Sequence, residues 1–432
     1  MIIASNILSQ TSASGISMED KRPELKPTLG LLDATAISVG AIIGAGIFVV
    51  TGIVAGMAGP ALLISMVIAA VVSLLTALSF AELSAWLPRE GSVYEFSYRL
   101  ISPFAGFTAG WMWILGNIFG GTAVSLGFAY YFASLFPVLQ PKLIAALLCL
   151  AFTALNHIGI KQSAILNNLL VGSKLIILTF FIVLGLGYMK AGNFRPFIPS
   201  YEGVLYGACY IFFAYGGFAR VSVVAEEVKD AEHTVPRAIL LSLLISTIFY
   251  LLIGFVAVGL VGATELSSSA SPLSKAIGIT GSSIAVYLVT VGGLMATASV
   301  LLTSILGVSR EAYAMARRSV LPSALSMLHP KYNTPYYAIW ISGIVMAILA
   351  LSTDLTKVVA VSTFGQLVYY TLANVSDLEL RSKRQVREKV VPMLGTVSCL
   401  GLLVFLFFLS PESWIAGAAG LIFGGAYYLL RR

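Results

Sequence analysis

The segment Ala36-Ile-Ser-Val-Gly-Ala-Ile-Ile-Gly-Ala-Gly-Ile-Phe48 decides how this chain folds, because three glycines interrupt an otherwise apolar run. A second apolar run, Ile211-Phe-Phe-Ala-Tyr-Gly-Gly-Phe218, carries a Gly-Gly pair at nearly the same distance from its start. Glycine supports a helix poorly, so both runs are expected to break near their middle. Close helix packing is the other explanation for glycine in a membrane helix, but the matched pair favours two unwound helices.

The composition is that of a membrane protein. Of the 432 residues, 58% are hydrophobic and 10% are charged, whereas about 25% of a soluble domain is charged. A soluble globular protein and a disordered chain are therefore excluded. A spanning helix takes about 20 residues, and the apolar runs predict twelve spans, at 34–57, 60–87, 104–135, 141–157, 164–188, 204–228, 237–262, 282–309, 336–352, 355–376, 392–409 and 412–430.

The basic residues predict the orientation of these spans. With the N-terminus inside, most Lys and Arg residues lie on loops of the cytoplasmic side, as the positive-inside rule requires. We therefore expect both termini in the cytoplasm, a location in the cell membrane, and contact with membrane lipid. The net charge of +7 reflects these loops, and no nucleic-acid partner is expected. The three cysteines and three histidines show no metal-ligand spacing, so neither a metal nor a cofactor is predicted.

The two interrupted runs occupy equivalent places in successive five-span units, 34–188 and 204–376. Such a pair points to the binding site of a transporter built from inverted repeats. Unwound backbone at membrane depth exposes N–H and C=O groups, which is tolerated where they line a cavity. Free N–H groups at a helix start suit a carboxylate, and carbonyls suit an ammonium group. The predicted substrate is therefore a free amino acid.

Several short motifs, taken in their order and spacing, carry a family resemblance. They are Ser38–Phe48, Phe80–Leu83, Pro88–Tyr94, Gly110-Trp111, Phe212–Phe218, Ala225–Val228, Val235–Ala238, Ser309–Arg317 and Leu321-Pro322. The chain resembles the amino acid–polyamine–organocation family of permeases over about residues 28–430, and in particular its prokaryotic proton-coupled members.

The resemblance implies an all-α integral membrane protein with a LeuT-like fold. Twelve transmembrane helices would form two inverted five-helix repeats plus two C-terminal helices, with helices 1 and 6 unwound at mid-membrane. The expected parts are a cytoplasmic N-terminal tail at 1–28, the first repeat at 29–190, the second at 203–376, and helices 11 and 12 at 390–432.

The resemblance also implies a substrate site at the two breaks. The substrate carboxylate would meet the N–H groups of Ala45 and Gly46, beside Gly44. Its ammonium would meet the carbonyls of Ile42, Phe213 and Gly216, and Phe213 would also act as a gate. The expected rim of the pocket comprises Ile43, Asn117, Gly121, Phe213 and Ala219.

Lys174 is a lysine inside a predicted span, which costs roughly 2.5–3.5 kcal/mol at the centre of a membrane helix and marks a functional candidate. Snorkelling to the inner interface is the alternative. Some proton-coupled members of the family have a lysine here, where it resembles a substitute for a sodium ion. In that role its ammonium braces the first break against the eighth span, through Ser299, with Thr297 as a second candidate, and through carbonyls near Ile43.

Arg220 also lies inside a span, and arginine stays protonated. It needs an anion, and we expect a structural ion pair with Glu82 or Glu226. An acidic substrate and snorkelling are the alternatives. Glu82 and Glu226 are expected at an inner gate or on solvated helix ends. Many relatives carry an acid where this chain has Ala219, so the resemblance does not carry over acid-dependent coupling or recognition of a cationic side chain.

The predicted function is secondary active transport of amino acids by alternating access, as a proton symporter. An amino-acid exchanger, with Lys174 as a static brace, is the alternative within transport. An intramembrane enzyme or a channel is more remote, because an enzyme needs a catalytic constellation at membrane depth and only Lys174 with Ser173 stands there. Small or neutral amino acids are favoured as substrates, since no acid is visible for a cationic side chain; the sequence does not reveal the oligomeric state.

Overall fold

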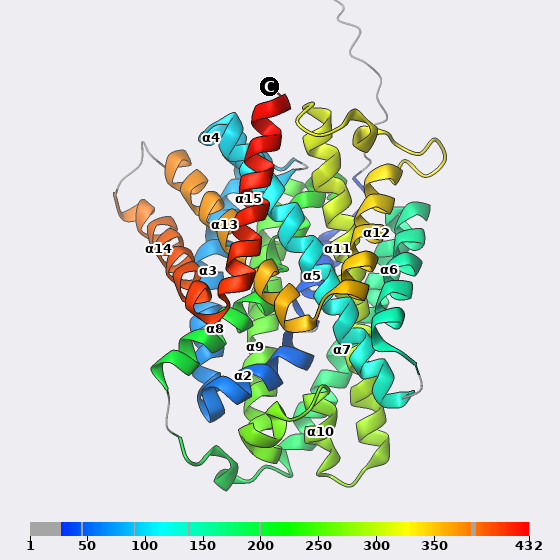
Figure 1. Cartoon of the computed structure of the whole chain (residues 1–432), viewed down its shortest axis with the longest axis vertical. Coiled ribbons are helices and arrows are strands. Elements are labelled where there is room, and N and C mark those ends of the chain that lie inside the picture. The colour runs from blue at the N-terminus through cyan, green and yellow to red at the C-terminus, as the bar shows by residue number, and fades with distance from the viewer. Residues whose placement is uncertain are drawn as a thin grey trace, which may run out of the picture.

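The computed structural model describes residues 27–44, 46–89, 91–136, 139–197, 200–381 and 386–431. These residues form an elongated bundle of helices, and their only strand-like pairing is an isolated bridge between Leu29 and Val228 (Figure 1). Ten helical segments among them are long and apolar enough to cross a membrane. The all-α, multi-pass prediction is therefore confirmed.

The α-helices follow the predicted apolar runs closely. They are α1 Leu31–Ile42, α2 Thr51–Ala58, α3 Leu62–Trp86, α4 Ser92–Leu100, α5 Pro103–Leu135, α6 Pro141–Ile158, α7 Ile160–Leu186, α8 Tyr201–Tyr215, α9 Ala231–Ser267, α10 Pro272–Gly278, α11 Ser283–Arg317, α12 Tyr336–Ser352, α13 Leu355–Leu380, α14 Val386–Leu409 and α15 Pro411–Arg431. Shorter 3₁₀ or π turns are η1 Gly46–Val50, η2 Gly59–Ala61, η3 Ala191–Phe194, η4 Phe218–Glu227 and η5 Ser323–Ser326. One of the ten segments, Leu31–Trp86, extends from α1 to the end of α3. The apolar helix α12 has 17 residues and is not counted among the ten.

Local sequence explains where several helices begin. Ser102, Ser200 and Ser282 each precede a helix, and their hydroxyls accept the backbone N–H three residues later. Such a cap satisfies one of the four N–H groups that a helix start leaves unpaired. The long helices then bury small and apolar residues against each other and expose large apolar side chains, among them Ile176, Leu244, Ile348, Val397 and Phe423. Side chains of this kind on the outer surface suit the hydrocarbon of a bilayer.

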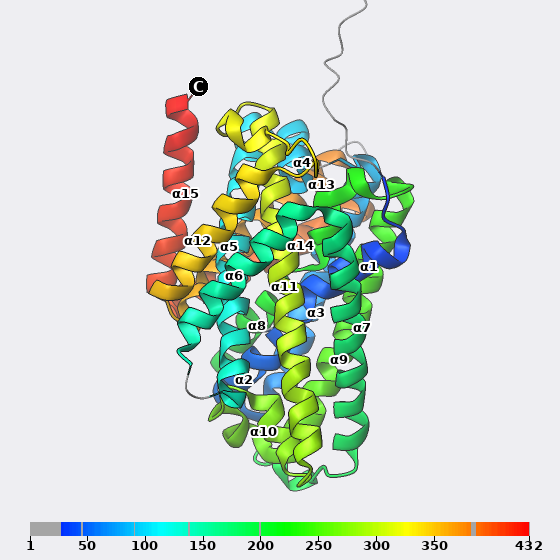
Figure 2. The same cartoon turned by 90° about the vertical axis from the view of Figure 1, so that its right-hand side faces the viewer.

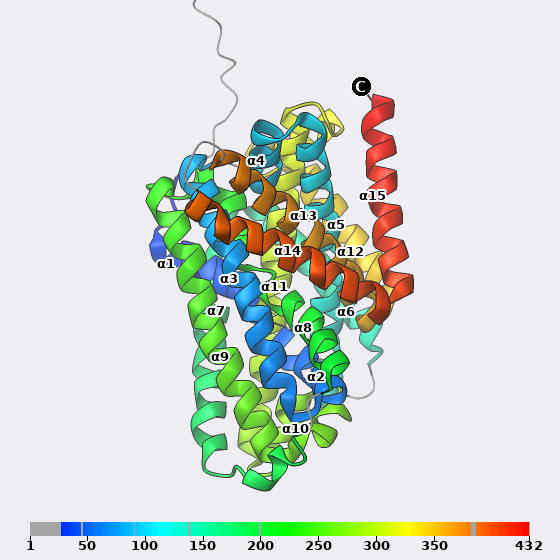
Figure 3. The same cartoon turned by 90° about the vertical axis from the view of Figure 1, so that its left-hand side faces the viewer.

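The helices divide into a packed centre and an outer layer. α5 packs against both α11 and α13, while α3 packs against α8 and α9. α14 crosses α3 obliquely on one side, and α15 runs along another edge of the bundle (Figures 2 and 3). The short α10 lies at the end of the bundle opposite the C-terminal end of α15 (Figure 1).

The two glycine-containing runs are interrupted where the sequence predicts. α1 ends at Ile42, Ile43 has extended backbone with φ −78° and ψ 96°, and the helix resumes only as η1 and α2. α8 ends at Tyr215, and after Gly216 and Gly217 the chain continues as the tighter η4. Each apolar run is therefore two half-helices that meet at a break in the interior of the bundle.

A buried ion pair joins η4 to α11. Arg310 Nε lies 3.0 Å from Glu227 Oε1, and the two side chains are 1% and 3% exposed. Removing one partner of such a pair leaves the other charge buried, at a cost of about 3–5 kcal/mol. We therefore expect Arg310→Met to lower the melting temperature of the detergent-purified protein strongly, whereas Arg310→Met combined with Glu227→Met should recover most of the loss.

The control for this prediction is the exposed pair of Lys357 and Glu412, whose charged atoms are 3.6 Å apart. An exposed pair contributes at most about 1 kcal/mol, so Lys357→Met should leave the melting temperature almost unchanged. A double variant that is as unstable as Arg310→Met alone would show that the buried charge is not the cause.

Candidate functional site

The glycines at both breaks allow two backbones to approach each other closely. A Cβ atom added at Gly46 would overlap the side chain and backbone of Ala214 in α8. A Cβ atom added at Gly217 would overlap the backbone of Ala41 in α1. Packing and unwinding are therefore not rival explanations here, because the glycines bring the two unwound segments together.

Two tyrosines, which sequence analysis missed, bind the carbonyls that the breaks release. The hydroxyl of Tyr250 lies 2.7 Å from the carbonyl oxygen of Ile42 and 3.0 Å from that of Ala214, so its proton can be donated to either break. The hydroxyl of Tyr370 donates to the carbonyl of Gly216 over 3.0 Å. A tyrosine inside an apolar span needs a hydrogen-bond partner for its hydroxyl. This requirement could have identified both tyrosines as candidates for binding the released carbonyls.

Lys174 connects the first break to α11. Its side chain is fully buried, and Nζ donates to the carbonyl of Ile43 at 2.5 Å, to that of Gly40 at 3.2 Å and to Ser299 Oγ at 2.7 Å. The ammonium thus points into the protein, which rules out snorkelling in this structure. The other predicted hydroxyl is not a partner, because Thr297 Oγ1 donates to the carbonyl of Gly293 one turn back in its own helix.

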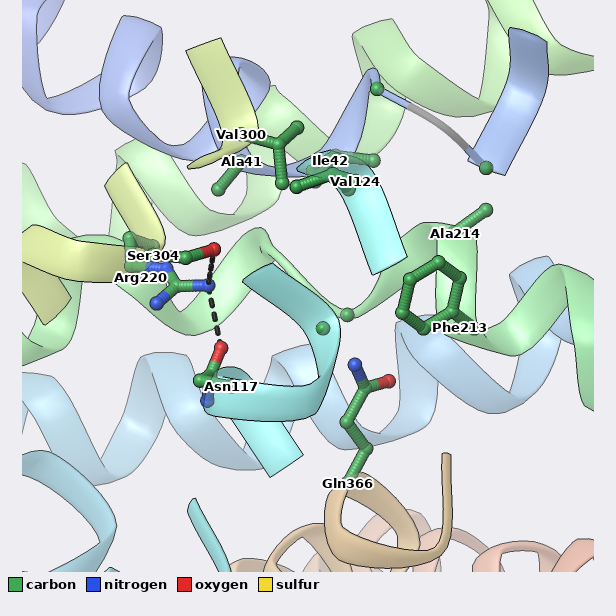
Figure 4. Close-up of a pocket in the computed structure, with 14 residues that line it drawn as sticks. Ala41, Ile42, Asn117, Val124, Phe213, Ala214, Arg220, Val300, Ser304 and Gln366 are labelled. Carbon is green, nitrogen blue, oxygen red and sulfur yellow. Dashed lines mark hydrogen bonds between the residues drawn. The ribbon is translucent and has the colours of Figure 1, made fainter. Parts of the chain in front are cut away.

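A small cavity lies where the two breaks meet α5, α11 and α13 (Figure 4). Its volume is about 30 Å³, enough for about two or three water molecules, since each needs about 10–15 Å³ on this scale. Six predicted site residues line it, namely Ile42, Gly44, Gly46, Asn117, Phe213 and Gly216. The lining residues that sequence analysis did not assign to the substrate site are Ala41, Gly120, Val124, Ala214, Arg220, Val300, Ser304 and Gln366.

The remaining predicted site residues are not among those that line the cavity. Ala45 is outside the described residues. Ile43 contacts Lys174 through its carbonyl, and Ala219 is buried without lining the cavity. Gly121 was expected on the rim of the pocket, and this expectation is corrected. A Cβ atom added at Gly121 would face Met346 of α12 and Ser304, whereas the neighbouring Gly120 lines the cavity. One residue along a helix turns the side-chain position by about 100°, which the sequence pattern did not resolve.

Arg220 does not form the ion pair expected from the sequence. Glu82 lies 3.5 Å from Arg381, and Glu226 lies 3.8 Å from Arg317. Arg220 instead donates from Nη2 to Asn117 Oδ1 over 2.6 Å and stacks its guanidinium 5.1 Å from the ring centre of Trp113. The Arg220 side chain therefore lies between α5 and α11 and not beside Glu82 or Glu226.

The described residues contain no group of three or more His, Cys, Asp or Glu side chains that could hold a metal ion. The cavity offers other chemistry, namely two helix breaks with backbone polar groups and a buried guanidinium at one end. The Lys174 ammonium binds the first break from outside this cavity. This arrangement can bind a small polar molecule but holds no constellation for bond cleavage among the residues that line it.

Comparison with known proteins adds independent information. A family model described as amino acid permease matches residues 29–421. An uncharacterized transporter of Mycobacterium tuberculosis is 37% identical, with 95% of this chain and 92% of that protein covered. The branched-chain amino acid permease BcaP of Bacillus subtilis is 33% identical, with 90% and 89% covered. The methylthioribose transporter of Bacillus subtilis is 32% identical, with 96% and 95% covered.

Proposed function

Because this chain belongs to the amino acid permease family, we propose that it is a secondary active transporter that moves amino acids across the cell membrane together with protons. Its relatives are named transporters and permeases rather than enzymes, and a multi-pass helical protein suits transport. We further propose a LeuT-like arrangement of twelve spans, with inverted repeats at 29–190 and 203–376, helices 11 and 12 at 390–432, and both termini, including the tail 1–28, in the cytoplasm.

The proposed substrate site is the cavity at the two breaks. The α-carboxylate would bind at the backbone N–H groups of Ala45 and Gly46, and the ammonium at the carbonyls of Ile42, Phe213 and Gly216. Of these, Gly46, Ile42, Phe213 and Gly216 line the cavity. The carbonyls of Ile42 and Gly216 already accept one hydrogen bond from a tyrosine, but a carbonyl oxygen has a second lone pair for an ammonium.

The size of the cavity supports alternating access. About 30 Å³ is too small for an amino acid, so the half-helices must separate before substrate enters. A wider hollow of about 530 Å³ opens between α2, η3 and α9 and would serve as the outer vestibule. We propose that Phe213 closes over the substrate, and that Glu82 and Glu226, with their arginine partners, belong to an inner gate.

The contacts of Lys174 are the observation that carries proton coupling. As an ammonium, it holds two carbonyls of the first break and Ser299 of α11 in one cluster. A neutral amine would hold these oxygens less tightly, because hydrogen bonds from a charged donor are about twice as strong. Loss of its proton would therefore release the break from α11 and let the half-helix move.

One observation favours the exchanger as a second candidate. No carboxylate of the described residues contacts Lys174, whose partners are backbone carbonyls and one hydroxyl. Without a proton acceptor nearby, Lys174 would remain charged and act as a static brace, and the protein would exchange one amino acid for another.

Uptake by the purified protein in liposomes tests the proposal. With an acidic exterior and no sodium, we expect accumulation of labelled amino acid above the external concentration, and collapse of the gradient by a protonophore should abolish it. Exchange predicts a different result, in which labelled substrate enters only when unlabelled amino acid is preloaded. Absence of binding and transport for all twenty amino acids, with transport of a sugar such as methylthioribose, would refute amino-acid transport.

A further inference from the structure

Arg220 places a positive charge at the substrate cavity without a carboxylate to balance it. The residue is 4% exposed and lines the cavity. Its hydrogen-bond partners are the neutral Asn117 Oδ1 at 2.6 Å and Ser304 Oγ at 3.5 Å. Burying an ion is expensive unless an opposite charge accompanies it, and no Asp or Glu is among the residues that line this cavity.

The surroundings of Arg220 hold its guanidinium in one position and leave part of it available. Trp113 lies under the guanidinium, and Gly307 of α11 makes room for it, since a Cβ atom there would overlap Nη1 and press against Cδ. Nη2 faces the cavity, where it donates to Asn117 over 2.6 Å and reaches Ser304 only at 3.5 Å, whereas Nη1 lies on the far side, beside Gly307 (Figure 4). The second N–H of Nη2 therefore has only a long contact, which a ligand acceptor in the cavity can replace with a shorter hydrogen bond.

The cavity therefore has two ends of different character. Figure 4 shows Arg220, Ser304 and Asn117 together at one end, with Phe213 and Ala214 at the other. The unwound segments, where the α-amino and α-carboxyl groups are proposed to bind, lie between and beside them. Gln366 of α13 adjoins Gly216, and its Oε1 is a further buried acceptor without a partner. Acceptors thus lie at the proposed ammonium position, and the cation of Arg220 lies at one end of the cavity, where a substrate side chain could extend.

We propose that this cavity selects amino acids with an acidic side chain, and that the side-chain carboxylate binds to Nη2 of Arg220 in place of Ser304. The inference rests on the proposed amino-acid transport and specifies its substrate class. It departs from the sequence-based preference for small or neutral amino acids and takes up the acidic substrate that the sequence left as an alternative partner for Arg220. A dicarboxylic amino acid supplies the missing negative charge, a neutral one leaves the guanidinium unpaired, and a cationic one is repelled.

A comparison of isosteric substrates on the unaltered protein tests the inference directly. Binding of labelled L-glutamate, L-aspartate, L-glutamine, L-asparagine, L-leucine and L-lysine is measured by scintillation proximity, and uptake is measured in liposomes. A hydrogen bond to a charged group gained or lost changes affinity by about 10- to 100-fold, so glutamate or aspartate should bind at least that much more tightly than its amide.

The possible results separate the two proposals. Tighter binding of glutamine, asparagine or leucine than of the acids would overturn acidic selectivity and leave amino-acid transport standing. Failure of all six to bind or enter, in protein that elutes as a single folded species, would overturn acidic selectivity, and the same failure with all twenty amino acids would overturn amino-acid transport as well. Because this ranking uses the unaltered protein, it is decisive even where variants of Arg220 fail to fold.

Variants then assign the selectivity to Arg220. Arg220→Gln should reduce the preference for glutamate over glutamine by about 10- to 100-fold, and Arg220→Lys should keep the preference for acids with weaker binding. Arg237, an exposed arginine at the start of α9, gives the matched control, and Arg237→Gln should retain the preference of the unaltered protein. A folded Arg220→Gln variant that still prefers the acid would overturn the assignment.

Discussion

Replacing Lys174 with alanine is expected to abolish proton-driven accumulation of substrate. With one proton per substrate, a gradient of one pH unit can sustain about tenfold accumulation, since a factor of ten corresponds to about 1.4 kcal/mol. The Lys174→Ala protein should instead reach equal concentrations on both sides. The substitution removes the donor to the carbonyls of Gly40 and Ile43 and to Ser299, so the link between α7, the first break and α11 is lost.

The measurement compares uptake into liposomes with and without a pH gradient, and with and without sodium. Lys142→Ala is the matched control, because Lys142 is half-exposed and pairs with the exposed Asp354 at the surface. Both it and the unaltered protein should accumulate substrate independently of sodium. Unchanged accumulation by Lys174→Ala would show that Lys174 is not the coupling group, and loss of exchange as well as accumulation would favour the static brace.

Replacing Gly46 with alanine should reduce substrate affinity by at least about 100-fold, because the two breaks can no longer meet in their present positions. An added Cβ would overlap both Cβ and Cα of Ala214, and backbone atoms cannot give way as a flexible side chain can. Overpacking of this kind costs about 1–3 kcal/mol of stability. The larger effect falls on binding, since η1 and α8 present the backbone groups proposed to hold the substrate.

Gly172 gives the matched control for this substitution, because it lies exposed in α7 and an added Cβ meets nothing within 4 Å. Gly172→Ala should bind substrate normally and be slightly more stable, since alanine is favoured over glycine in a helix by about 1 kcal/mol. Binding is measured by scintillation proximity, and folding by the melting temperature. Normal affinity in Gly46→Ala would show that the close approach of η1 and α8 is not needed for the site.

The sequence by itself determined the helical class, the membrane setting and the position of both breaks. These features depend on local properties, namely the length of an apolar run and the glycines within it. Inside a bilayer, an apolar run of this length hydrogen-bonds its own backbone N–H and C=O groups by forming a helix. The place of Lys174 beside the first break, with Ser299 as a partner, was implied by the family resemblance and not by the apolar pattern, which left snorkelling open; in the structure Nζ lies 2.7 Å from Ser299 Oγ.

Only the tertiary structure decided which partners the polar side chains have. Arg220 turned from the expected Glu82 or Glu226 to Asn117 and Trp113, Ser299 rather than Thr297 met Lys174, and Tyr250 joined the two breaks. Each of these contacts joins residues on different helices, and its existence depends on how the helices rotate and slide against one another. A rotation of one residue exchanges the side chain that faces a cavity, as at Gly120 and Gly121, and nothing in a local apolar pattern specifies that rotation.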